Sequence, residues 1–279
     1  MLMKALWLIF TLLTIQAVQS APQSILSIYG EDDRKNFSDA KPDTQKFFKS
    51  IGVIADNRSL KSYPALATTV SEKFSVCKSE KYSQDLTVGE CTGFLISPNK
   101  FLTAAHCIKD RYSFCSKHKI IFNFTDKFIQ QTSFAKYIFG TQLVECSKVH
   151  LHPSEDVALL ELKSAINAPA LSMAERLPKA VFSIGSPLGV PLKMTNSNYI
   201  EEVDQYEFLT QTDTFNGSSG SPVFDASTSK VAGILTEGEN DFSYDKKFKC
   251  FRYRKCTENN CSGERVLKYS AFKGWLKSF

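Results

Sequence analysis

Most of the chain from about Phe47 onward consists of short apolar runs separated by turn residues. Each run is roughly four to eight residues long and rich in Val, Ile, Leu and Phe, which is typical of β-strands. In the first half the runs include Ser50–Ile54, Cys91–Ile96, Ile120–Phe124 and Val157–Leu162. In the second half they include Ala180–Ile184, Tyr206–Leu209, Pro222–Phe224 and Val231–Leu235. The pattern therefore predicts an all-β fold.

The C-terminal residues follow a different pattern. Apolar positions fall close to helical spacing at Val266, Tyr269, Phe272, Trp275, Leu276 and Phe279, which predicts an amphipathic helix over about 266–279. A linker around Ser164–Ser172 divides the rest into halves of about 47–165 and 170–265, which share no sequence repeat. We expect two β-structured halves with one C-terminal α-helix packed on them.

Residues 1–20 have the pattern of a signal peptide. A short basic start, Met1–Lys4, precedes the apolar stretch Ala5–Leu13, and Val18–Ser20 suits cleavage before Ala21. An uncleaved membrane anchor is the alternative, but this apolar stretch is short for a bilayer span. We therefore predict a secreted or periplasmic protein with no stable membrane span after signal cleavage.

The composition and charge agree with an exported globular protein. The chain has 279 residues, of which 43% are hydrophobic and 23% charged, and its eight cysteines suit an oxidising compartment. The net charge of +5 comes from dispersed basic residues, so we expect no nucleic-acid partner. Residues 21–46 are polar and mixed in charge, which favours a propeptide or a peripheral N-terminal arm rather than core. We expect a monomer.

The stretch Thr210–Phe224 contains the strongest candidate for chemistry. At its centre, Gly217-Ser-Ser-Gly-Ser-Pro222 forms a tight turn in which the glycines permit positive φ or close backbone approach. Ser219 would stand exposed between them, and the amides of Gly217 and Ser219 would converge as the two donors that an oxyanion requires. The sequence therefore predicts a nucleophilic serine.

A serine needs a base, and a group that orients the base, to become a nucleophile. The segment Leu102–Cys107 supplies His106, and Ser154–Leu160 supplies Asp156. With Ser219, these residues occur in the order His, Asp, Ser, which is the order of the chymotrypsin-type arrangement.

These segments together resemble those of the chymotrypsin-fold serine peptidases. Cys91–Cys107 is similar to the family's histidine segment, Asp156–Leu160 to its aspartate segment, and Gly217–Pro222 to its nucleophile loop. The likeness extends over roughly residues 47–279. The Gly-Ser-Ser-Gly-Ser-Pro-Val-Phe form and the short spacings between motifs are most similar to the bacterial V8-like, glutamyl-endopeptidase-like branch.

The resemblance implies two six-stranded antiparallel β-barrels and a disulfide between Cys91 and Cys107. It also implies a serine endopeptidase that acts on protein or peptide substrates without a cofactor. Ser219 would attack the scissile carbonyl, His106 would transfer the proton, and Asp156 would orient the imidazole. The amides of Gly217 and Ser219 would bind the oxyanion.

Other residues compete for these roles. The alternative nucleophiles and bases are Ser218, Ser221, His118, His150 and His152. Two of them, His150 and His152, could be drawn with Glu155 as a zinc site, but we expect no metal. A protease-like scaffold that binds without catalysis is a further alternative, which the filled triad positions disfavour.

The remaining cysteines have several possible pairings. They are Cys77, Cys115, Cys146, Cys250, Cys256 and Cys261. The last three are too loosely spaced for a good zinc knuckle, and export favours disulfides. We expect at least one bond within the loop Glu237–Gly263.

The resemblance also suggests a substrate preference. Asp213 matches the acidic base of the S1 pocket in trypsin-like members, which predicts cleavage after Lys or Arg. The facing wall of the pocket would contain Thr236, Glu237 and Gly238, and Glu237 would add a second acidic group.

Two neighbouring positions leave alternatives open. Thr214 matches a position that helps to bind glutamate in V8-like members, whereas Leu235 stands where glutamate-specific members carry a histidine. If Asp213 instead turned away and capped backbone amides, the pocket would be neutral or would accept glutamate or an apolar side chain.

The segment before the nucleophile departs from the trypsin pattern. Ser218 stands where trypsin-like zymogens carry the aspartate that captures the new N-terminal amine, so any activation must work differently. Ser27–Arg34 is similar to the region near the mature N-terminus of V8-like enzymes, so processing near it is expected.

Overall fold

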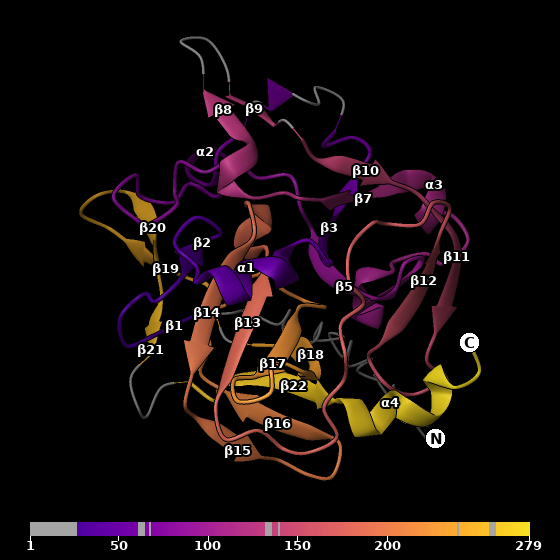
Figure 1. Cartoon of the computed structure of the whole chain (residues 1–279). Helices are drawn as coiled ribbons and strands as arrows, with labels where there is room; N and C mark the ends of the chain where they lie inside the picture. The colour runs from indigo at the N-terminus through magenta and orange to yellow at the C-terminus, as the bar shows by residue number, and fades with distance from the viewer. Residues whose placement is uncertain are drawn as a thin grey trace, which may run out of the picture.

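Two antiparallel sheets make up most of the computed structural model, which describes residues 27–60, 65–66, 68–131, 136–138, 140–238, 240–256 and 261–279. The first sheet has the strand order β10 (Gln142–Val144), β7 (His118–Phe122), β3 (Ile51–Asp56), β5 (Cys91–Ser97), β6 (Lys100–Thr103), β12 (Ala158–Leu162) and β11 (Cys146–Leu151). The second has the order β15 (Ile200–Glu202), β16 (Glu207–Thr210), β22 (Glu264–Lys268), β18 (Val231–Glu237), β17 (Pro222–Asp225), β13 (Val181–Gly185), β14 (Lys193–Ser197) and β2 (Lys35–Asn36). Figure 1 shows the two curled sheets packed against each other.

Smaller elements surround these sheets. The strands are β1 (Ile28–Tyr29) with β21 (Lys255–Cys256), β19 (Phe242–Asp245) with β20 (Cys250–Tyr253), and β4 (Ala65–Leu66) with β9 (Lys136–Ile138) and β8 (Ile129–Gln131). The α-helices are α1 (Pro42–Phe48), α2 (Val70–Phe74), α3 (Phe114–Lys117) and α4 (Tyr269–Leu276), and the 3-10 turns are Ala105–Cys107, Asp126–Phe128 and Pro187–Gly189. None of the helices described in the structure is long and apolar enough to cross a membrane.

The all-β prediction with a C-terminal helix is confirmed, although the sheets have seven and eight strands where six in each were expected. One added strand is β2, which joins the edge of the second sheet by pairing with β14. The apolar runs became strands because each sheet encloses its own core, around residues such as Phe101 and Leu160 in the first and Phe208 and Val223 in the second.

A third core lies between the two sheets. It contains Phe94 and Leu102 of the first sheet together with Phe224 and Ile234 of the second, all fully buried. Helix α1 covers part of it through Phe47, whose ring centroid lies 5.1 Å from that of Phe224. This shared apolar layer fixes the two halves relative to each other, so that loops from both meet at one place.

The C-terminal helix is shorter than the pattern predicted. Helix α4 begins at Tyr269, and Val266 belongs to β22, where it pairs with Phe208 on one side and Leu235 on the other. Two neighbouring strands thus satisfy the backbone around Val266, and its helical spacing to Phe272 is incidental. Phe272 itself is buried against the core shared by the two sheets.

The N-terminal segment from residue 27 onward is more deeply packed than a peripheral arm. Ser27, Ile28 and Arg34 are buried, β1 pairs with β21, and β2 extends the second sheet. Figure 1 shows this indigo segment beside β13, β14 and β21. The polar composition of residues 21–46 hid this because most of its described charged residues are not buried, and the buried Arg34 is packed against aromatic rings that are distant in the sequence. The predicted signal peptide, residues 1–20, lies outside the described residues.

All eight cysteines form disulfides, joining Cys77 to Cys250, Cys91 to Cys107, Cys115 to Cys146 and Cys256 to Cys261. The predicted Cys91–Cys107 bond is therefore confirmed, as is the expectation of a bond within Glu237–Gly263. The Cys77–Cys250 bond attaches strand β20 to the segment that follows helix α2.

Candidate active site

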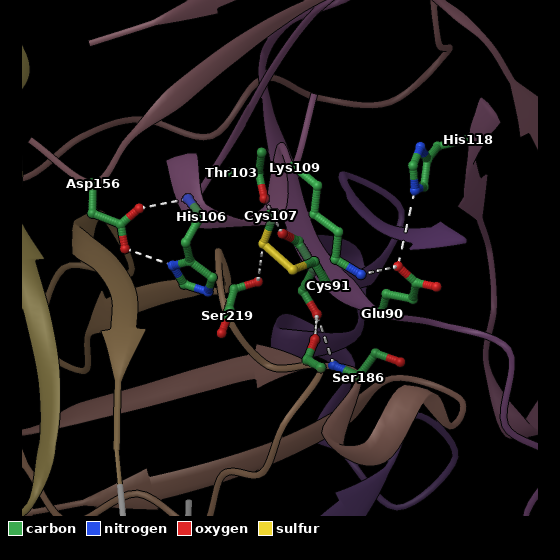
Figure 2. Close-up of a disulfide and its surroundings, with 12 residues drawn as sticks. Glu90, Cys91, Thr103, His106, Cys107, Lys109, His118, Asp156, Ser186 and Ser219 are labelled. Atoms are coloured by element: carbon green, nitrogen blue, oxygen red, sulfur yellow. Dashed lines mark hydrogen bonds and ion pairs between the residues drawn. A yellow bond between two sulfur atoms is a disulfide. The ribbon is translucent and has the colours of Figure 1, made fainter. Parts of the chain in front are cut away.

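His106 lies in a short 3-10 turn directly after strand β6. The turn is anchored on both sides: the Thr103 hydroxyl donates to the carbonyl of Thr92 at 2.7 Å, and Cys107 is bonded to Cys91 of β5. Figure 2 shows the imidazole beside this disulfide. Because a short closed loop restricts the chain, the disulfide holds the histidine backbone in place.

Asp156, in the loop between β11 and β12, makes two contacts with His106. Its Oδ2 lies 2.6 Å from His106 Nδ1, and its Oδ1 accepts the His106 backbone N–H at 2.8 Å. The side chains of His106 and Asp156 are 42% and 33% exposed, so the pair lies at the surface. The two contacts fix the ring orientation and turn Nε2 away from the carboxylate (Figure 2).

The nucleophile loop is held against the histidine segment by its own backbone. The Ser219 carbonyl accepts a hydrogen bond from the Thr92 amide at 2.8 Å and lies 3.9 Å from Cys107 Sγ, and the Gly217 carbonyl accepts from the Thr92 hydroxyl at 2.8 Å. Figure 2 draws Ser219 beside the His106 ring. The loop thus brings the third predicted triad residue to the other two.

The two glycines of this loop are required by its geometry. Gly217 has φ +96° and Gly220 has φ +86°, and a Cβ at either position would lie within 2.6 Å of a backbone oxygen, that of Ser186 or that of Thr92. Positive φ and such close approach favour glycine. Within the described part of the chain, the amides of Gly217 and Ser219 donate to no protein acceptor, as an oxyanion site requires.

No hydrogen bond joins the Ser219 hydroxyl to His106 among the described residues. Catalytic hydrogen bonds are often long or poorly aligned without substrate and tighten in the complex. Ser219 is half-buried in this loop.

The competing residues are placed less favourably. Ser218 and Ser221 are both buried. His118 stacks on Phe114 at 4.3 Å between ring centroids, and His150 Nε2 lies 2.7 Å from Glu161. Burial, ring stacking or a carboxylate contact thus engages each of these four residues away from the His106–Asp156 pair.

Some of the atoms that the metal alternative would use are engaged in protein contacts. His152 Nδ1 accepts the amides of Ser154 and Glu155, so the zinc site drawn from His150 and His152 would lose that ligand atom. His106 and the sulfurs of Cys91 and Cys107 lie within 4.8 Å of one another. Those sulfurs are joined as a disulfide, which provides no thiolate ligand.

Asp213 does not stand free at the floor of an S1 pocket. It is buried, and its two carboxylate oxygens accept the backbone amides of Tyr29 at 2.7 Å and Asp33 at 2.9 Å. Both carboxylate oxygens are thus already engaged, and the role of Asp213 in substrate preference stays a prediction. Asp213 instead accepts backbone amides, which was the alternative to a role at the pocket floor. These amides belong to the N-terminal segment.

The other residues predicted for the pocket are also engaged. The Thr214 hydroxyl donates to Glu264 at 2.5 Å, and the Thr236 hydroxyl donates to the carbonyl of Arg265 at 3.3 Å. Glu237 is exposed and lies 3.3 Å from Arg265 Nε. Gly238 follows strand β18 and is partly exposed. The two acidic groups expected to bind Lys or Arg thus already have partners.

Sequence reasoning missed the residues beneath this loop. Arg34, Asp241 and Glu264 are ionisable residues buried directly behind Asp213–Asn216. No local signal marks them, because each lies in a polar stretch of ordinary composition. A buried ionisable group of this kind needs a partner. Arg34 has Asp32 two positions away together with distant aromatic rings, whereas the contacts of Asp241 with Asn216 and of Glu264 with Thr214 join distant segments.

The enclosure of Asp213 predicts a pH-dependent stability. Burial raises the pKa of Asp213 to about 7, a shift that the nearby Asp33 and Asp32 charges support and the two amide bonds oppose. The pKa is raised on folding, so the contribution to stability is full at acid pH and is lost as pH rises from about 4 to about 7. By linkage, the loss between pH 5 and pH 8 is about 3 kcal/mol.

This dependence can be measured by urea unfolding of the wild type and of Asp213→Asn at pH 5 and pH 8. We expect the wild type to lose stability relative to the variant as the pH rises. Parallel changes in the two proteins would contradict the raised pKa.

Residues 91–234 match the family of trypsin-like peptidase domains, and the chain belongs to this family. The match includes His106, Asp156 and Ser219. A search of curated proteins finds no match. The Vibrio cholerae VesB protease is similar in structure, with a TM-score of 0.53 and 15% identity over 88% of this chain and 66% of that chain. An inactive mutant form of Rv3671c from M. tuberculosis H37Rv matches with a TM-score of 0.49 and 17% identity over 85% and 89% of the two chains. The similarity to the VesB protease supports the chymotrypsin-like fold.

Proposed function

We propose that this protein is an exported serine endopeptidase that uses His106, Asp156 and Ser219 as a catalytic triad. The observation that carries the proposal is the double contact between Asp156 and His106, with the Ser219 loop hydrogen-bonded to Thr92, the neighbour of Cys91. The family of trypsin-like peptidase domains supports a peptidase. The four disulfides fit an extracellular or periplasmic location.

The mechanism follows from the orientation of each group. Asp156 accepts a hydrogen bond from His106 Nδ1–H, so Nε2 is the nitrogen without a proton and can take the Ser219 hydroxyl proton as the oxygen attacks the scissile carbonyl. The amides of Gly217 and Ser219 then bind the oxyanion. His106 gives the proton to the leaving amine, which leaves an acyl group on Ser219, and water releases it by the same steps.

The substrate preference is proposed to be for an uncharged P1 side chain rather than Lys or Arg. Both oxygens of Asp213 are bonded to amides of the N-terminal segment, and Glu237 is paired with Arg265. A cationic side chain would therefore meet no free carboxylate from these two residues. The similarity to the V8-like branch rests on the motif form alone and is kept as a proposal.

The test is incubation of the purified protein with a phosphonylating serine reagent and, separately, with a mixed peptide library. We expect a single phosphonyl label on Ser219 and cleavage that resists chelators. Absence of both labelling and hydrolysis would favour a binding scaffold, and loss of hydrolysis with chelator would favour a metallohydrolase. Cuts predominantly after Lys or Arg would contradict only the P1 proposal.

A further inference from the structure

The guanidinium group of Arg34 is enclosed by aromatic rings beneath the nucleophile loop. Its side chain is 1% exposed, and its Cζ lies 4.4 Å from the ring centroid of Phe215, 4.7 Å from that of Tyr253 and 5.5 Å from that of Tyr82. Asp32 receives it in a forked ion pair, with Nε–Oδ1 at 2.9 Å and Nη2–Oδ2 at 2.5 Å. Stacking and bidentate pairing are contacts that a lysine does not reproduce.

The segment around Arg34 contacts consecutive residues of the nucleophile loop. Asp213 accepts the amides of Tyr29 and Asp33, and Phe215 packs on Arg34 itself. Between them, Thr214 donates to the buried carboxylate of Glu264, and the Tyr29 hydroxyl donates to its other oxygen at 3.0 Å. The backbone immediately before Asn216–Ser219 is thus held by the N-terminal segment.

The same segment is fixed to the second sheet on its other side. The Asp33 carboxylate accepts the Thr195 hydroxyl at 2.5 Å and the Asn196 amide at 3.0 Å, both on strand β14. Thr195 also accepts the Asp213 amide at 3.0 Å. The N-terminal segment therefore connects a rigid strand to the loop that carries the oxyanion donors.

We propose that Ser27–Arg34 is a permanent part of the active enzyme and that Arg34 is a positioning residue for the Gly217 amide. The proposal rests on the serine-peptidase function proposed above. In trypsin-like members a charged residue at the position of Ser218 orders the oxyanion loop. Ser218 is uncharged, and we assign the ordering of this loop to Arg34 instead. Removing the segment would strip both amide donors from the buried Asp213 carboxyl, which is costly, so a discarded propeptide is disfavoured.

The test is the Arg34→Met variant, with Arg58→Met as a matched control. Arg58 makes the same kind of fork with Asp56, at 3.0 and 2.9 Å, but its side chain is 82% exposed and it lies outside the site. Misplacing one oxyanion donor lowers kcat by about 10²–10³. We expect this loss in Arg34→Met with little change in KM, and unchanged kinetics in Arg58→Met.

A transition-state analogue separates positioning from general destabilisation. A peptide boronate should bind Arg34→Met more weakly by the same factor as the loss of kcat, while a non-covalent peptide inhibitor keeps its affinity. Equal weakening of both ligands, or wild-type kcat in Arg34→Met, would overturn the positioning role. If Arg34→Met does not fold, Arg34→Lys and Tyr29→Phe decide by the same kcat and boronate measurements.

The permanence of the segment is tested on the protein that reacts. Intact-mass analysis of phosphonyl-labelled enzyme should find Ser27–Arg34 still attached. A labelled, active form that begins after Arg34, or activity that rises when the chain is cut at an engineered site at Ser38–Asp39, would overturn the proposal. If the wild type neither hydrolyses peptides nor takes the label, the proposed function fails instead.

Discussion

Replacing Ser219 by alanine is expected to lower kcat by about 10⁴–10⁶ while the protein remains folded. The reason is that Ser218 and Ser221 are buried on either side of Ser219 and cannot replace it at the His106 imidazole. Replacing His106 by alanine should have a similar effect, because the two residues act as one unit. The measurement is peptide hydrolysis at saturating substrate, with folding checked by circular dichroism.

The double variant and a surface serine provide the controls. Removing Ser219 and His106 together should cost little more than removing either one, since their effects are not additive. Ser116→Ala, at an exposed position whose hydroxyl donates to the Ser113 carbonyl within the same turn, should keep full activity. Substantial activity in Ser219→Ala would place the nucleophile elsewhere and refute the triad.

Replacing Asp156 by asparagine is expected to lower kcat by about 10⁴ without changing the fold. The side-chain oxygen would keep its bond from the His106 amide, so the new NH₂ group would face Nδ1. Nδ1 would then be the acceptor and Nε2 would carry the proton. An imidazole in this tautomer cannot take the proton of Ser219.

Glu161→Gln is the matched control, because Glu161 contacts His150 at 2.7 Å in a similar histidine–carboxylate pair outside the site. We expect wild-type kinetics from Glu161→Gln, and for Asp156→Asn a loss in kcat rather than in KM. Loss of activity in both variants would indicate a general effect of carboxylate removal, and near-normal activity in Asp156→Asn would exclude its orienting role.

The sequence by itself determined the strands and the candidate triad, because the information for both is local. Apolar runs must be buried whichever partner covers them, so their positions could be predicted before their pairing was known. The glycines beside Ser219 are needed for a backbone that only glycine adopts easily, at φ +96° and +86°. His106 and Asp156 were identified through the short motifs that contain them.

Only the tertiary structure decided how the site is supported and what surrounds its pocket. Asp213 and Tyr29 are 184 positions apart, and Tyr29 and Glu264 are 235 apart, so no local pattern relates them. A charged residue in a polar stretch has the same appearance in a sequence whether it is solvated or buried. Asp213 is buried because distant backbone amides satisfy it, and Arg34 because distant aromatic rings enclose it together with the nearby Asp32; this enclosure is a property of the folded chain alone.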